Sequence, residues 1–194
     1  TDPLTGLLNR RAFREEVLSH SVRADRGGVP STLMCVDLDH VKSVNDRMGH
    51  ETGDKVLLRV AELLRDIVRP ADLVARLGGD EFALWLGGAD HMTAAERAEA
   101  LRTGVPDALD EIVGATPPRV TLSIGIATRA VGAGGDIEGL IRRAGGAVWA
   151  RHHRRHPPLS RPFGPAGPRR QVRTTLRNAK DGRIPGRRHA PDQR

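Results

Sequence analysis

The chain has 194 residues, carries a formal net charge of +7 and contains a single cysteine, Cys35. One cysteine excludes an internal disulfide, so we expect a reducing compartment and a cytoplasmic location. The length fits one domain with an appendage, and no apolar run approaches the ~20 residues that cross a bilayer, so we expect no membrane partner.

The first predicted helix spans about residues 10–25 and follows an entry turn at residues 1–9. Asn9 stands where a helix N-cap is expected, and Phe13 and Val17 begin an apolar face. The chain begins directly at this turn, so we expect that an upstream input segment is missing.

A short apolar run at residues 32–38 is rich in strand-forming residues and predicts a strand buried on both faces. It ends in Asp37 and Asp39, and a carboxylate at the end of a buried strand needs a partner or a cation. A helical turn at 40–46 and a longer amphipathic helix at 51–68 follow.

Two apolar runs within residues 73–86 flank Gly78 and Gly79 and predict a β-hairpin, because a Gly-Gly pair supplies the positive φ angles of a tight turn. Asp80 and Glu81 follow directly. Glycines and acidic residues at one hairpin tip suit the binding of a metal-bound phosphate ester. The alternative is an ordinary solvated turn, which can contain the same residues.

The next helix is predicted at 93–103 and is expected to be interrupted at Gly104 and Pro106. A strand at 119–128 and a last helix at 136–150 complete the pattern. Interleaved strands and helices predict an α/β fold, with a mixed, mostly antiparallel sheet flanked by helices.

The positive charge belongs to the end of the chain. Residues 151–194 contain twelve Arg and one Lys against two Asp, a net charge of +11, which leaves −4 for residues 1–150. This composition cannot bury enough apolar surface to order itself. We therefore divide the chain into a domain at residues 1–150 and a basic, disordered tail at 151–194.

The tail could contact nucleic acid or anionic lipid through arginine charge. Its only aromatic residue is Phe163, so we expect no specific nucleic acid partner. An incidental extension or a frame-shifted C-terminus is an alternative account.

The order of the motifs in residues 1–150 resembles the GGDEF-domain family, the diguanylate cyclases that join two GTP molecules into cyclic di-GMP. The segments that carry the resemblance are Asp2 to Arg11, Asp37 to Asp39, Asn45 to Asp54, Arg76 to Phe82 and Val120 to Ala127. The resemblance implies a five-stranded, nucleotidyl-cyclase-like sheet and a transient homodimer in which each subunit holds one GTP.

By this resemblance, Asp37, Asp80 and the backbone carbonyl of Leu38 are ligands of Mg²⁺ or Mn²⁺, and Glu81 is an acid–base helper. Hard cations held by carboxylates suit the joining of a 3′-hydroxyl to an α-phosphorus, because they shield phosphate charge and stabilise pyrophosphate. For Asp37 alone, a helix N-cap is the alternative.

The resemblance also implies a set of substrate contacts. Asn45 and Asp54 would recognise guanine, since an amide and a carboxylate complement its edge. Lys42, in the catalytic set with Asp80 and Glu81, would hold phosphates near a helix N-terminus. Capping for Asp54 and simple solvation for Lys42 are the alternatives. The remaining predicted contacts are Arg76, Gly78 and Gly79, with a surface strand position as the alternative for Arg76.

Arg69 and Asp72 match the RxxD site at which cyclic di-GMP, the product, also acts as an inhibitor in the family. Arginine suits this role because its planar fork can pair with phosphate or a guanine edge. As a bare pattern, RxxD is weak.

The sequence departs from the family pattern at several positions, most of them near or just beyond the end of the last predicted helix. Two histidines, His152 and His156, stand where the family has Lys and Arg. Histidine is mostly neutral near pH 7 and binds triphosphate poorly. A degenerate domain that binds GTP or cyclic di-GMP without efficient catalysis is therefore the alternative function, unless Arg151, Arg154 or Arg155 replaces the missing charge. The departures are Val41 for Phe, Gly145 for Asp, Val148-Trp149 for Leu-Tyr, His152 for Lys and His156 for Arg.

Overall fold

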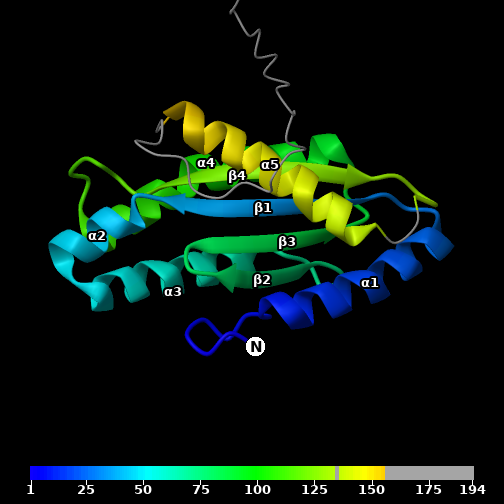
Figure 1. The fold of residues 1–194 in the computed structure, drawn as a ribbon, viewed down its shortest axis with the longest axis horizontal. Helices are drawn as coiled ribbons and strands as arrows, with labels where there is room; N and C mark the ends of the chain where they lie inside the picture. Colours follow the sequence, from blue (N-terminus) through cyan, green and yellow to red (C-terminus); the bar gives the residue numbers. More distant parts are fainter. Residues whose placement is uncertain (134–135, 156–194) are drawn as a thin grey trace, which may run out of the picture. The chain divides into compact units, whose positions relative to one another are not determined.

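The structure, a computed structural model, describes residues 1–133 and 136–155, and the predicted tail beyond residue 155 lies outside this part (Figure 1). Helices and strands are interleaved along the described chain, which confirms the predicted α/β class. In chain order the elements are α1 (Arg10–Gly27), β1 (Ser31–Asp39), α2 (Val41–Met48), α3 (His50–Ile67), β2 (Leu73–Gly78), β3 (Glu81–Gly87), α4 (His91–Val113), β4 (Thr121–Arg129) and α5 (Ile137–Arg155).

The sheet has the strand order β2-β3-β1-β4, and every neighbouring pair is antiparallel. Within the described residues it has four strands, so the implied five-stranded count is wrong there. An isolated parallel bridge joins Leu8 to Ala75 at the outer edge of β2. The pairing stops after this bridge because Asn9 caps α1, its side chain accepting from the N–H of Ala12 at 2.9 Å.

The two faces of the sheet carry separate apolar cores, because successive side chains of a strand point to opposite faces. Met34, Val36 and Leu38 of β1 pack with the layer formed by α2, α3 and α4. Leu33 and Cys35 pack with α1 and α5 on the other face. Figure 1 shows α5 in front of β1 and β4, with α4 behind them.

Helix α4 is continuous from His91 to Val113, so the predicted interruption at Gly104 and Pro106 is wrong. Proline removes one backbone hydrogen bond from a helix interior. Here Pro106 is buried together with Leu101 and Leu109, and this packing outweighs the local cost. The last helix also continues to Arg155, five residues beyond the predicted end at 150.

Candidate functional site

Gly79 and Asp80 form the two-residue turn of the β2–β3 hairpin, one residue later than the predicted Gly78–Gly79 turn, and Gly78 is the last residue of β2. Gly78 has a φ of 140° and Gly79 a φ of 53°, values that residues with a side chain rarely adopt. The register shifts between Arg76 and Gly78, and Gly78 pairs with Glu81 across the turn. The glycines therefore set the backbone path that positions Asp80 and Glu81.

Neighbouring strands bring the acidic residues of two distant segments to one end of the sheet. Asp37 of β1 lies opposite Glu81 of β3. The N–H of Leu38 donates to the carbonyl of Asp80 at 3.2 Å. The two predicted acidic segments are thus adjacent, at the end of β1 that leads into α2.

The donor groups at this end of the sheet fit a hard divalent cation. Asp37 and Asp80 supply carboxylates and Leu38 a carbonyl, the oxygen ligands that Mg²⁺ prefers. Among the residues that the structure describes, no group of three or more His, Cys, Asp or Glu side chains is arranged to hold a metal. This donor set suits Mg²⁺, which commonly combines one or two carboxylates with water and substrate phosphates.

Asp39, the second acid at the end of β1, serves the fold. Its side chain is buried and accepts hydrogen bonds from the hydroxyls of Thr121 at 2.8 Å and Ser123 at 3.0 Å. These partners come from β4, so the carboxylate ties the end of β1 to its neighbouring strand. Burial of a carboxylate here is compensated by hydroxyl donors.

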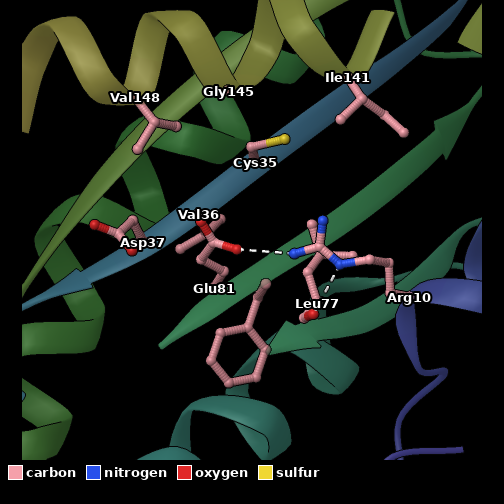
Figure 2. Close-up of a pocket in the computed structure, with 10 residues that line it drawn as sticks. Arg10, Cys35, Val36, Asp37, Leu77, Glu81, Ile141, Gly145 and Val148 are labelled. Atoms are coloured by element: carbon pink, nitrogen blue, oxygen red, sulfur yellow. Dashed lines mark hydrogen bonds and ion pairs between the residues drawn. The ribbon is translucent and has the colours of Figure 1, made fainter. Parts of the chain in front are cut away.

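A pocket of about 370 Å³ lies beside the paired acids, between α1, the hairpin and α5 (Figure 2). Its wall is mainly apolar and carries three charged side chains, Arg10, Asp37 and Glu81. Burial, assisted by the charge of Glu81 and opposed by that of Arg10, raises the pKa of the Cys35 thiol, which also lines this pocket, to about 12. The thiol therefore stays protonated near pH 7, which argues against a nucleophilic role.

Arg76 holds the hairpin turn to the start of the chain. Its guanidinium donates twice to the carbonyl of Gly79, at 3.0 and 2.7 Å, and pairs with Asp2 at 3.2 Å. Burial opposes ionisation of Asp2, but hydrogen bonds from Thr5 and Arg76 hold its pKa below the ordinary value. The structure thus engages Arg76 within the chain, with its side chain only 13% exposed.

Arg10 reaches the same hairpin from the first position of α1. Its guanidinium contacts the carbonyl of Leu77 and the carboxylate of Glu81 (Figure 2). Sequence reasoning missed this residue, because nothing in the local sequence distinguishes Arg10 from Arg11. The parallel bridge at Leu8 offers no sequence signal either, since it forms only in the folded chain.

The residues predicted to bind guanine lie on α2 and α3. The side chain of Asn45 packs against Gly53, and a Cβ added at Gly53 would lie 1.9 Å from Oδ1 of Asn45. This oxygen is buried without a hydrogen-bond partner among the described residues. Asp54 is exposed in the second turn of α3, which begins at His50, so it is not a first-turn capping acid. Lys42 is exposed in the first turn of α2.

The two ends of the RxxD pattern have different environments. Arg69 is exposed, whereas the side chain of Asp72 is 1% exposed. The Asp72 carboxylate accepts from the N–H groups of Arg69 at 3.0 Å and Gly87 at 2.9 Å, and from the guanidinium of Arg97 at 2.9 Å. Asp72 thus joins three segments of the chain and is turned away from solvent.

The structure describes the departures from the family pattern only in part. Val41 is buried in the core. Gly145 and Val148 line the pocket, and a Cβ at Gly145 would meet open space. The side chains of Trp149 and His152, and all of residue 156, lie outside the described part. No helix within that part is long and apolar enough to span a bilayer.

Comparison with known proteins gives a consistent match. A family profile described as "Diguanylate cyclase, GGDEF domain" matches residues 1–156. The response regulator PleD of Caulobacter vibrioides is 38% identical over 152 residues, which are 77% of this chain and 33% of that protein. Diguanylate cyclase DgcP of Pseudomonas aeruginosa is 40% identical over 126 residues, 65% of this chain and 19% of that protein.

Among solved structures, the GGDEF domain of DgcB from Caulobacter crescentus, in complex with c-di-GMP, matches with a TM-score of 0.69 and 34% identity. The match covers 80% of this chain and 87% of that one. The chain thus spans most of a solved domain, but only about a fifth to a third of the length of the two curated relatives.

Proposed function

The chain belongs to the GGDEF-domain family, and on that basis we propose that it is a diguanylate cyclase, which condenses two GTP molecules into cyclic di-GMP and releases pyrophosphate. The observation that carries the proposal is the meeting of two acidic segments: Asp37 opposite Glu81, and Leu38 hydrogen-bonded to Asp80. A nucleoside triphosphate and its cations could bind where these two segments meet.

Asp37, Asp80 and the carbonyl of Leu38 would hold Mg²⁺ or Mn²⁺. When bound, these ions would favour deprotonation of the 3′-hydroxyl and shield the phosphates and the pyrophosphate leaving group. Glu81 lies beside these ligands, where it could take the proton of the hydroxyl. Lys42 and the first backbone N–H groups of α2 would bind the β- and γ-phosphates.

Each subunit would hold one GTP, so two copies must meet, and we propose a transient homodimer. Asn45 and Asp54 would read the guanine edge. Gly78 and Gly79 would let the hairpin approach the nucleotide closely, because neither carries a Cβ. Arg76 would support this turn through Gly79 and Asp2, consistent with the contacts described above.

The proposal is tested by incubating the chain with GTP and Mg²⁺ and measuring cyclic di-GMP and pyrophosphate. We expect two pyrophosphates per cyclic di-GMP, and an initial rate that rises more steeply than linearly with protein concentration. Tight binding of GTP or cyclic di-GMP with no product would favour a second function, that of a nucleotide-binding module. That function is supported by Gly145, which leaves a pocket wall without a side chain.

We expect Gly53→Ala to raise the KM for GTP by about 10-fold or more, with a smaller change in kcat. A Cβ at this position would stand 1.9 Å from Asn45 Oδ1, so the amide must move away from the guanine, and the loss of one such contact costs about 1.4 kcal/mol or more. Steady-state kinetics with GTP measure the effect.

Gly104→Ala is the matched control, since it adds the same Cβ inside a helix where nothing lies within 4 Å. An unchanged KM in Gly53→Ala would show that Asn45 does not contact the base. A similar rise in both variants would point to a general effect of the substitution.

A further inference from the structure

One guanidinium joins the two strands of the hairpin on either side of its turn. Arg10 Nε donates to the carbonyl of Leu77 on β2 at 3.0 Å, and Arg10 Nη2 pairs with Oε2 of Glu81 on β3 at 3.1 Å (Figure 2). Leu77 directly precedes Gly78 and Glu81 directly follows Asp80. Arg10 therefore fastens both ends of the segment that carries the proposed metal ligand Asp80.

This turn needs such support from outside its own backbone. Its two glycines adopt positive φ angles, and the ladder between β2 and β3 is irregular between Arg76 and Gly78. Glycine also has more conformational freedom than other residues, so the turn has a high entropic tendency to open. A planar fork with two donors suits a carbonyl and a carboxylate at the same time.

The exposure of the Arg10–Glu81 ion pair indicates that its main role is not to stabilise the fold. The side chains of Arg10 and Glu81 are 58% and 55% exposed, and ion pairs at such exposure contribute little to the stability of the fold. Arg11, the next residue, also forms an exposed pair, with Glu15 at 3.0 Å, but on α1 itself and away from the hairpin. Arg10 differs from Arg11 because its partners lie on the hairpin and not on α1.

Resting on the cyclase function proposed above, we propose that Arg10 is a positioning residue for the reaction: it fixes the Glu81 carboxylate and the Gly78–Asp80 turn at the wall of the pocket. Lys42, Asn45 and Asp54, which would bind the phosphates and the guanine of GTP, lie on α2 and α3, whereas the contacts of Arg10 are with the hairpin. Loss of Arg10 therefore lowers kcat more than it raises KM.

The test compares Arg10→Ala, Arg10→Lys and the control Arg11→Ala. We expect kcat of Arg10→Ala to fall about 10- to 100-fold, as for other small misplacements of reacting groups, with KM for GTP and the unfolding midpoint close to wild type. Arg10→Lys keeps the charge but not the fork, so it recovers only part of the rate, and Arg11→Ala stays at the wild-type rate.

An unchanged kcat in Arg10→Ala, an equal loss in Arg11→Ala, or full recovery by lysine would overturn the proposal. Amide hydrogen exchange of residues 78–81 provides a second readout that needs no activity. Faster exchange in Arg10→Ala than in Arg11→Ala supports the positioning role even if wild-type protein makes no cyclic di-GMP, which would refute only the cyclase function. Equal exchange in both variants refutes the positioning role.

Discussion

Asp80→Asn is expected to reduce formation of cyclic di-GMP by about 10³-fold, or about 4 kcal/mol of transition-state stabilisation. Asparagine keeps the size of the side chain and leaves the backbone carbonyl that accepts from Leu38 at 3.2 Å. It removes the negative charge that a divalent cation requires. The turn geometry therefore persists while the metal ligand is lost, and product accumulation at saturating GTP and Mg²⁺ measures the difference.

Asp66→Asn is a suitable control, because it makes the same change at an exposed position near the end of α3. We expect its rate and its unfolding midpoint to match those of wild type. Removal of a metal ligand should leave far less than about a tenth of the wild-type rate. If Asp80→Asn keeps more than that, the assignment of Asp80 as a metal ligand is incorrect. Higher Mg²⁺ concentrations should not restore the rate.

Asp72→Ala is expected to lower the free energy of unfolding by about 3 kcal/mol. Its carboxylate is 1% exposed and holds the N–H groups of Arg69 and Gly87, together with the guanidinium of Arg97. Alanine leaves these donors without their acceptor and leaves a largely buried positive charge, which is among the costlier defects in a protein. Equilibrium unfolding in urea measures the loss.

A double-mutant cycle with Arg97→Ala separates the two contributions. If the ion pair dominates, Asp72→Ala should cost much less when Arg97 is already absent. If the backbone N–H groups dominate, the costs of the two substitutions should add. Asp66→Ala provides the exposed control, for which a change within about 0.5 kcal/mol is expected.

The environment of Asp72 also bears on the hypothesis, implied by the family resemblance, that cyclic di-GMP inhibits this chain through the RxxD pattern. An exposed Arg69 is available to a phosphate or a guanine edge, whereas Asp72 is committed to the fold. We therefore propose that Arg69 makes the main contact with cyclic di-GMP. Unchanged stability in Asp72→Ala combined with lost inhibition would instead identify Asp72 as a ligand contact.

The elements of this fold were predictable where local chemistry decides them. The glycine-containing hairpin, the Asn9 cap and the apolar periodicity of α3 depend on a few neighbouring residues, and the structure has each of them, with the turn one residue later than predicted. Helix α4 was not predictable in the same way. Local propensity favours a break at Pro106, but contacts with distant segments keep the helix continuous.

The candidate site shows the same division. Acidic residues at strand ends and glycines at a turn are visible in the sequence, so the main candidates could be named. The groups that hold them are not visible, because they come from far along the chain: Arg10 meets Glu81 across 71 residues, and Asp39 meets Ser123 across 84. Such pairs depend on which strands become neighbours.

The buried thiol of Cys35 gives this protein an internal reporter of its own opening. It is the only cysteine in the sequence, it lies in β1, one of the two inner strands, and its pKa of about 12 leaves almost no reactive thiolate at neutral pH. The thiol packs with α1 and α5 and lines the pocket beside them, so alkylation by a small electrophile depends on access from this face of the sheet. The labelling rate then follows how often this face is uncovered, without any engineered probe.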